Sequence, residues 1–315
     1  MQATSSPVLP SQEKAVALAP IEVSYSALIW RRLRRDRLAM FGAVLVGLLI
    51  IVALFAPVLA PHDPSEQFRD GLTLDGQPVP STLFRSAGGT EFLLGTDANG
   101  RDLLSRIFYG ARVSLMVGLL ANLLAVALGI MIGMAAGYLG GWVETLLMRF
   151  TDIMMAFPTL LLAMTLVAIL KPSLWIIIVV IGLVYWTWIA RVVYSQVLAM
   201  REREFVIAAR ALGGSRTHVI LHHVLPQLIP VIIVWGTLGI ATNVMLEASL
   251  SYLGIGVQPP TPSWGGMIQQ GQSYYRSAPW LVVYPGLAIM ITVFAFNLLG
   301  DGLRDALDPT HRGTL

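Results

Sequence analysis

Three histidines lie close together in the chain, and their spacing makes them the first candidates for metal chemistry. His218 and His222 are four residues apart, which places them on one face of a helix, and His223 is adjacent. A hydrolytic zinc site of the H-E-x-x-H type needs a glutamate between its histidines, whereas the residues between these are Val-Ile-Leu. We therefore expect no metal site, and interpret the histidines as part of a helix that faces solvent or a partner.

A second candidate is the stretch GTDANGRD at 95–102, which looks like a calcium loop. In an EF-hand loop beginning at Asp97, the glycine at position 100 would come too early and the twelfth residue would be Phe108 instead of glutamate. We expect this stretch to form a turn.

Two absences narrow the chemistry further. Lys14 and Lys171 are the only lysines, and neither follows the Gly-x-x-x-x-Gly of a nucleotide-binding P-loop. If ATP drives this protein, another chain must supply the ATPase. The chain also has no cysteine, which excludes disulfides and cysteine-based metal sites.

The composition indicates which elements must carry these residues. The 315 residues are 56% hydrophobic and only 12% charged, with a mean hydropathy of +0.71. A soluble domain carries about 25% charged residues, so this composition is typical of an integral membrane protein. The net charge of +3 comes from arginines beside apolar segments, which topology explains better than nucleic-acid binding does.

Six segments are long and apolar enough for a helix that crosses about 30 Å of hydrocarbon. They cover 38–60, 111–138, 146–170, 173–195, 228–253 and 281–301. The third and fourth are separated only by Lys171-Pro172-Ser173, where we expect a tight turn because the residue before a proline disfavours helix. The sequence predicts an all-α membrane protein with six transmembrane helices.

Arginine bias gives the orientation. The cluster RRLRRDR at 31–37 precedes the first span, so the N-terminus is predicted to lie in the cytoplasm. Six crossings then place both termini and loop 201–226 in the cytoplasm. We divide the chain into a cytoplasmic tail (1–24), a basic interfacial helix on membrane lipid (25–37), the first span with its outer loop (38–110), a five-helix core (111–303) and a second cytoplasmic tail (304–315).

Polar groups within the spans are few, and each is a functional suspect because burial in lipid is costly. Asp152 lies three residues after Arg149, and an ion pair on one helix face is the simplest account of it. Glu247 lies toward the outer end of the fifth span. Three asparagines could form hydrogen bonds between helices: Asn122, Asn243 and Asn297. Small residues at every fourth position of the second span predict close helix packing: Ala121, Ala125, Gly129, Gly133 and Gly137.

Segment 201–226 differs from its apolar flanks. Residues 203–212 favour a helix, Gly213-Gly214 breaks it, and Ser215 can cap a second short helix that Pro226 is expected to stop. The result is a pair of short helices outside the membrane, fixed at both ends to spans.

The same segment carries residues that are poorly suited to water. Phe205 and Ile207 are apolar, and the small pair Ala208-Ala209 permits close approach by another surface. We expect a partner protein to cover this face, with an interfacial helix resting on lipid as the alternative.

The segment resembles the E-A-A-x-x-x-G … L-P loop of ABC importer permeases, although Ile207 stands where the family has a glutamate. Other strings resemble the second permease subunit of the dipeptide/oligopeptide/nickel branch. They are LAPHDP (59–64), LGTDANGRDLLSRIFYGARVSL (94–115), GYLGGWVETLLMRFTDIMMAFPTLLLA (137–163), EASLSYLGIGVQPPTPSWGGMI (247–268) and FNLLGDGLRDALDP (296–309).

This resemblance implies a type I ABC importer permease fold without catalytic residues, in a bacterial cytoplasmic membrane. It also implies a heterodimer with a homologous permease, two ATPase subunits that bind ATP and Mg²⁺, and an extracytoplasmic substrate-binding protein. The residues implied to couple with an ATPase are Phe205, Ile207, Ala208, Ala209, Arg210, Leu212, Gly213, Gly214, Leu225 and Pro226.

Peptides are the expected cargo, and nickel chelates or glutathione are alternatives within the same family. Two other classes stay open: an ATP-independent secondary transporter, and a membrane enzyme or channel that uses His218, His222 and Asp152. The absence of a chain of acids and histidines through the spans disfavours a proton-coupled transporter. The outer stretch GVQPPTPSWGGMI is expected to form a stiff ridge of prolines and Trp264 that faces the binding protein, or else a self-packed loop.

Overall fold

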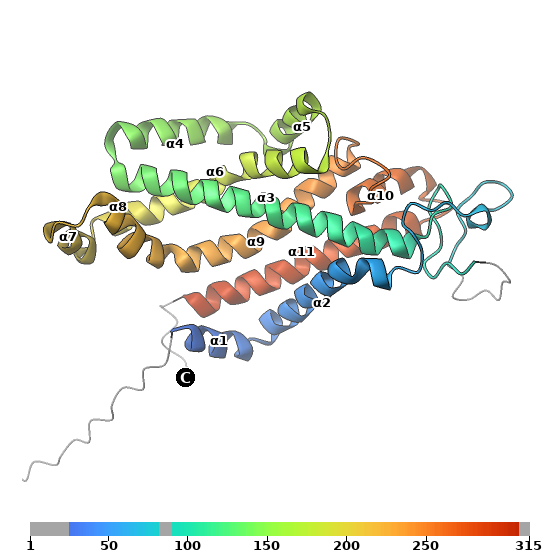
Figure 1. Cartoon of the computed structure of the whole chain (residues 1–315), viewed down its shortest axis with the longest axis horizontal. Helices are drawn as coiled ribbons and strands as arrows, with labels where there is room; N and C mark the ends of the chain where they lie inside the picture. The colour runs from blue at the N-terminus through green and yellow to red at the C-terminus, as the bar shows by residue number, and fades with distance from the viewer. Residues whose placement is uncertain (1–24, 82–89, 309–315) are drawn as a thin grey trace, which may run out of the picture.

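The computed structural model describes residues 25–81 and 90–308, and this part of the chain is built from helices (Figure 1). The long helices are α2 (Arg37–Leu59), α3 (Leu103–Leu139), α6 (Leu174–Arg201), α9 (Leu225–Tyr252) and α11 (Trp280–Leu307). The shorter ones are α1 (Tyr25–Arg35), α4 (Gly141–Ala156), α5 (Thr159–Leu170), α7 (Glu204–Ala211), α8 (Arg216–Val219) and α10 (Trp264–Gly271). The predicted tail 1–24 and most of the predicted tail 304–315 lie outside the described residues.

Within the described residues, five helices are long and apolar enough to cross a membrane, and a sixth crossing is possible if the bent pair α4–α5 counts as one span. The expectation of an unbroken helix over 146–170 is wrong, because α4 and α5 meet at 89°. The break falls at Phe157, which is extended (φ −86°, ψ 135°) as a residue before a proline prefers to be. The predicted span is therefore helical on both sides of Phe157, but it is two helices at an angle and not one straight helix.

The tight turn expected between the third and fourth spans is confirmed. Lys171 adopts a positive φ of 68°, which is costly for a residue with a side chain and reverses the chain sharply. Ser173 then caps α6, its Oγ accepting a hydrogen bond from the N–H of Ile176 at 3.3 Å.

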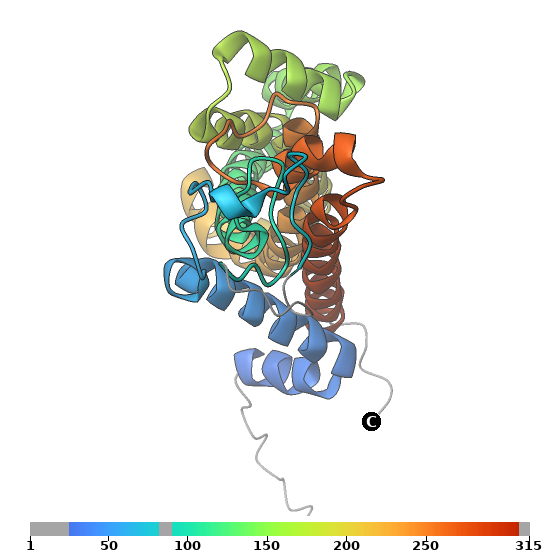
Figure 2. The same ribbon diagram turned by 90° about the vertical axis from the view of Figure 1, so that its right-hand side faces the viewer.

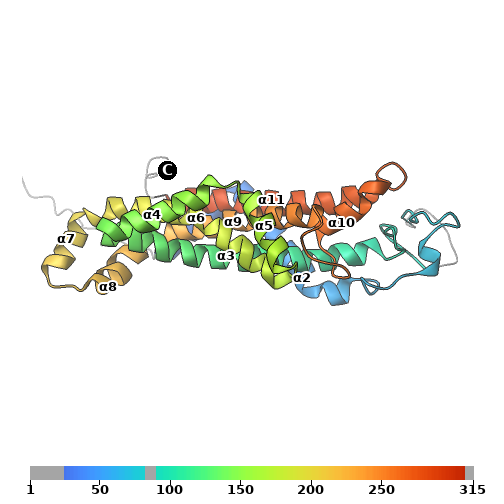
Figure 3. The same ribbon diagram turned by 90° about the horizontal axis from the view of Figure 1, so that it is seen from above.

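The core of the bundle is the contact between α3 and α6, which lie side by side in Figures 1 and 3. The small-residue stripe of α3 makes this contact possible, as predicted. A Cβ added at Gly133 would lie 2.6 Å from the carbonyl oxygen of Ala190, and one at Gly129 would lie 2.7 Å from Cβ of Ile189. The backbones therefore approach closely enough that glycine is required at these positions.

Helix α1 lies against the C-terminal end of α11 (Figure 2). Leu33 packs with Ala39 and Ala306, and Asp36 ends α1 and caps α2 by accepting from the N–H groups of Leu38 and Ala39. Nη1 of Arg32 donates to the carbonyl oxygen of Asp308 at 3.2 Å. This helix is therefore attached to the bundle as well as being basic.

The two ends of the bundle differ. Helices α7 and α8 project from one end, called here the α7 end, where α1 and the last turn of α11 also lie (Figure 1). The irregular stretches 60–81 and 90–102 lie at the opposite end, called here the loop end, with α10 toward it (Figure 3).

Candidate functional site

Segment 201–226 forms the helix–break–helix unit that its sequence predicts. Helix α7 ends before Gly213, which has a φ of 84° that an L residue rarely adopts. A Cβ at this glycine would meet nothing within 4 Å, so its backbone conformation alone requires glycine. Ser215 then caps α8, with its Oγ accepting from the N–H of His218 at 3.3 Å.

Pro226 does not stop the second helix, which corrects the sequence prediction. A π-helical turn (Ile220–Val224) joins α8 to α9, so that Arg216–Tyr252 is one continuous helix. Pro226 lies in the first turn of α9, where its missing N–H is tolerated. The projecting unit is thus joined to α6 by a two-residue turn on one side and continues directly into a spanning helix on the other.

The apolar side chains of this segment are uncovered in the single chain. Leu212 is 90% exposed, Ile207 53% and Phe205 39%. Val206 and Val219 are fully buried and join the core of α3 and α6, so they hold α7 against the bundle. The three exposed apolar side chains, Phe205, Ile207 and Leu212, are called here the apolar crest. An exposed apolar patch of this kind is typical of a surface that binds a partner.

The other residues of the predicted coupling set lie in the same segment as the crest but differ in how exposed they are. Ala208, Arg210, Gly213 and Pro226 are exposed, and Ala209, Gly214 and Leu225 are half-buried. Gly214 is also constrained sterically, because a Cβ there would lie 2.8 Å from the carbonyl oxygen of Ala209.

The histidines lie on the same unit. The rings of His218 and His222 stack at 4.4 Å, and Nδ1 of His222 lies 3.2 Å from the carbonyl oxygen of His218. Among the described residues, no group of three or more histidine, cysteine, aspartate or glutamate side chains could hold a metal ion. The histidines extend the polar side of a helix that is presented to the exterior.

A cavity of about 440 Å³ lies near the α7 end, between α6, α9 and α11. Gln196, Arg304 and Asp308 supply polar side chains at its wall, and Arg304 is exposed, with no ion-pair partner among the described residues. Sequence reasoning did not find this cavity, because its wall comes from three distant segments. The full lining is Val192, Gln196, Pro230, Val231, Val234, Trp235, Leu238, Arg304, Leu307 and Asp308.

Asp152 has a different partner from the one expected. It pairs with Arg191 of α6 rather than with Arg149, which is exposed. Tyr194, also on α6, donates its hydroxyl hydrogen to Oε1 of Glu144 at 2.5 Å. Both contacts tie α4 to α6, so Asp152 serves packing between helices.

The buried polar groups of the spans also connect helices. Glu247 is fully buried in α9 and accepts hydrogen bonds from Ser114 of α3 (2.9 Å) and Ser251 (2.6 Å). Nδ2 of Asn122 donates to the carbonyl oxygen of Gly236 at 2.6 Å, and Asn243 donates to Oδ1 of Asn122 at 3.4 Å. The interhelical role predicted for these two asparagines is confirmed, whereas Asn297 is exposed.

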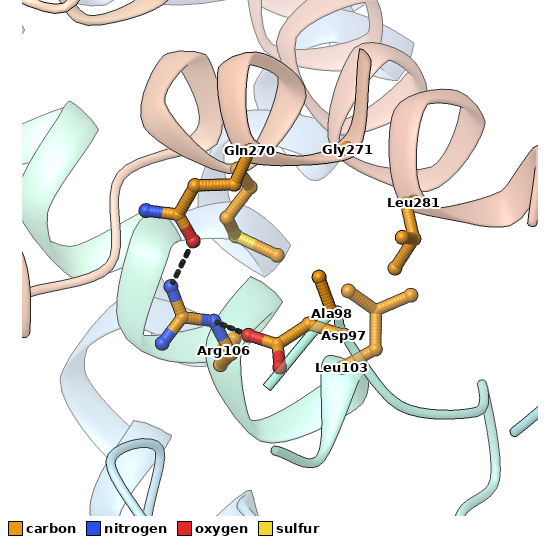
Figure 4. A pocket seen from close by; sticks show the side chains of 8 residues that line it. Asp97, Ala98, Leu103, Arg106, Gln270, Gly271 and Leu281 are labelled. Atoms are coloured by element: carbon orange, nitrogen blue, oxygen red, sulfur yellow. Dashed lines mark hydrogen bonds and ion pairs between the residues drawn. The ribbon is translucent and has the colours of Figure 1, made fainter. Parts of the chain in front are cut away.

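GTDANGRD forms a turn, as predicted, and the turn holds an ion cluster that the sequence did not reveal; Figure 4 shows Asp97, Arg106 and Gln270 of this cluster. Oδ1 of Asp97 accepts from the N–H groups of Asn99 and Arg101, while its Oδ2 lies 2.7 Å from Nε of Arg101 and 3.2 Å from Nε of Arg106. Both arginines also donate to Oε1 of Gln270 in α10. The cluster therefore joins the loop end of α3 to α10.

A second contact orders the same end. The N–H of Thr90 donates to Oδ2 of Asp70 at 2.9 Å, and this hydrogen bond lowers the pKa of Asp70.

The sequence predicted either an exposed ridge that includes Trp264 or a self-packed loop. Trp264 is buried, so the exposed ridge is wrong for this residue. It is 1% exposed, begins α10 and donates its Nε1–H to the carbonyl oxygen of Ile107 at 3.1 Å. Pro262 is buried as well, while Pro259 and Pro260 are exposed. The tryptophan anchors a self-packed loop because its large ring finds a closed pocket beside Gly110.

Models of two protein families match this chain. A family model described as "Binding-protein-dependent transport system inner membrane component" matches residues 129–313. A second, described as "N-terminal TM domain of oligopeptide transport permease C", matches residues 24–75.

Curated relatives match almost end to end. The chain is 40% identical over 300 residues to the dipeptide transport system permease protein DppC of Alkalihalophilus pseudofirmus, covering 95% of this chain and 93% of that protein. It is 43% identical over 284 residues to the glutathione transport system permease protein GsiD of Shigella flexneri, covering 90% of each. A solved structure of the MetNI methionine ABC transporter in an inward-facing conformation matches with a TM-score of 0.55 and 16% identity, covering 64% of this chain and 96% of that one, and this likeness concerns the fold.

Proposed function

This chain belongs to the family of binding-protein-dependent transport system inner membrane components, and we propose that it is the second permease subunit of an ATP-driven importer of small peptides. The dipeptide permease among its relatives supports peptide cargo. The glutathione permeases, which are equally similar, support glutathione, itself a peptide, as the second candidate.

The observation that carries this proposal is the exposed crest on α7, built onto a helix that continues into a span. An ATPase that covers Phe205, Ile207 and Leu212 would bury apolar surface at about 25 cal/mol per Å², which is a favourable term for docking. Because Arg216–Tyr252 is one helix, movement of the docked unit is transmitted directly to α9. The ATPase binds ATP and Mg²⁺, and this chain contributes no catalytic group.

The charge distribution supports an orientation with the α7 end and both termini in the cytoplasm. Exposed arginines gather there on α1 and on the α7–α8 unit, including Arg34, Arg210 and Arg216. The opposite loop end carries acidic residues and faces the extracytoplasmic binding protein. A homologous permease completes the passage beside this chain.

Co-purification tests the docking with a charge placed on the crest. Leu212→Asp changes a side chain that is 90% exposed, so the fold of the single chain is preserved while the apolar contact is lost. We expect the ATPase retained with the permease to fall by about tenfold or more. Leu74→Asp, at a fully exposed leucine of the loop end, is the matched control and should change nothing. Equal retention of the ATPase by both variants would refute docking at α7.

A further inference from the structure

The cavity between α6, α9 and α11 has the size and the mixed chemistry of a small-molecule site. Its volume of about 440 Å³ falls within the range of about 300–1,000 Å³ that is typical of ligand pockets. Val231, Val234 and Trp235 give it an apolar wall, and its polar groups come from Gln196, Arg304 and Asp308. Sites of this kind bind an apolar body and fix its orientation through a few polar contacts.

The lining carries one positive and one negative residue among the described positions, Arg304 and Asp308. The two buried arginines Arg101 and Arg106 are paired with Asp97, and the half-buried Arg191 is paired with Asp152. Arg304 is exposed at the rim of the cavity, and like the exposed Arg210 and Arg216 it has no ion-pair partner within residues 25–81 and 90–308. A cation in the last turn of a helix is also favoured by the helix dipole. That effect explains the charge, but it does not explain why an arginine borders a cavity.

The position of the cavity connects it to the unit that a partner would move. Five of its lining residues lie between Pro230 and Leu238 of α9. This stretch begins less than two helical turns after the π-helical turn that joins α8 to α9. Pro230 removes one hydrogen bond from the helix and permits bending there. Displacement of α7 and α8 would therefore be passed along α9 to this wall of the cavity.

We propose that this cavity is a cargo-binding station of the passage, and that Arg304 binds a free carboxylate of the peptide. The proposal rests on the importer function above. A guanidinium and a carboxylate form two parallel hydrogen bonds, which makes arginine well suited to hold one end of a short peptide. Trp235 and the valines contact its side chains. Dipeptides and glutathione both carry a free carboxylate, so the assignment holds for either cargo.

Direct binding tests this proposal in the permease–ATPase complex, held in nanodiscs without binding protein and without ATP. The probes are labelled dialanine, its C-terminal amide, and glutathione. We expect Arg304→Gln to weaken binding of the carboxylate-bearing cargo probe by about tenfold or more, and Arg304→Lys to weaken it less. The amide should bind wild type as weakly as dialanine binds Arg304→Gln. Arg276→Gln, at an exposed arginine remote from the cavity, should leave binding unchanged.

Three outcomes would overturn the assignment. The first is no binding of either carboxylate probe to wild type at about 1 mM. The second is equal binding by wild type and Arg304→Gln. The third is unchanged peptide binding with loss of co-purified anionic phospholipid, which would make the cavity a lipid site. ATP-driven uptake by the wild-type complex, measured on the same preparation, separates failure of this inference from failure of the importer function.

Discussion

Nε of Arg106, in the first turn of α3, lies 3.2 Å from Oδ2 of Asp97, and both side chains are almost fully buried. The same carboxylate also pairs with Arg101, so one acid neutralises two arginines at the loop end. Because α10 is attached through Gln270 to both arginines, this cluster organises the face that we propose receives the binding protein.

Asp97→Asn should therefore destabilise the protein more than other changes in this loop. The substitution leaves two buried guanidinium groups without a counter-charge, which costs about 3–5 kcal/mol. Thermal unfolding in detergent should show a markedly lower Tm. Asp75→Asn, at an exposed aspartate of the same loop, is the control and should have almost no effect. Equal Tm values for the two variants would contradict the buried-cluster account.

A second prediction concerns the contact between α3 and α6. Gly133→Ala places a Cβ 2.6 Å from the carbonyl oxygen of Ala190, and we expect a loss of about 1–3 kcal/mol in the free energy of unfolding. Gly47→Ala makes the same change in α2, where a Cβ meets nothing within 4 Å. That control should be neutral or slightly stabilising, since alanine favours helix over glycine by about 1 kcal/mol. Stabilisation by both substitutions would show that the helices are not in close contact.

The break between α7 and α8 yields a prediction about backbone conformation. Gly213 has a φ of 84° with open space around it, so Gly213→Ala should cost about 1 kcal/mol through strain alone. Gly213→Asn should cost less, because asparagine tolerates this region better. We expect ATPase co-purification to follow the order Gly, Asn, Ala. Equal association for all three residues would indicate that the bend does not position the docking surface.

Ile207 tests the nature of the docking surface, since the resembled family has a glutamate at this position. Ile207→Leu should keep ATPase association, and Ile207→Glu should weaken it by about tenfold, because a charge would be buried against an apolar partner. Stronger association with the glutamate would show that the partner offers a polar contact here.

The sequence was sufficient for those parts of the fold that depend on local chemistry. Apolar length identified the spans, the spacing of Gly129 and Gly133 identified a packing face, and Gly213 with Ser215 identified the break and the cap. The bend at Phe157 was missed because both halves of that span are apolar, although the following proline was a usable signal. The prediction that Pro226 ends the second short helix was wrong because this proline lies in the first turn of α9, where a proline is tolerated.

The parts that were not foreseen depend on residues far apart in the chain. Arg106 meets Gln270 across 164 positions, and the cavity takes its wall from α6, α9 and α11. Asp152 forms its ion pair with Arg191 because α4 packs along α6, whereas the local spacing in the sequence predicted a pair with Arg149. The periodicity of a single sequence does not predict these long-range side-chain contacts, because they depend on how the helices pack against one another.

Uptake into proteoliposomes tests the central claim most directly, because it asks which energy source moves the cargo. The permease pair, the ATPases and the binding protein are reconstituted, and labelled dialanine or glutathione is supplied on the binding-protein side. We expect uptake that requires ATP on the opposite side, persists when ion gradients are collapsed, and is lost with Leu212→Asp. Uptake that proceeds without ATP and disappears with the ion gradient would contradict the account.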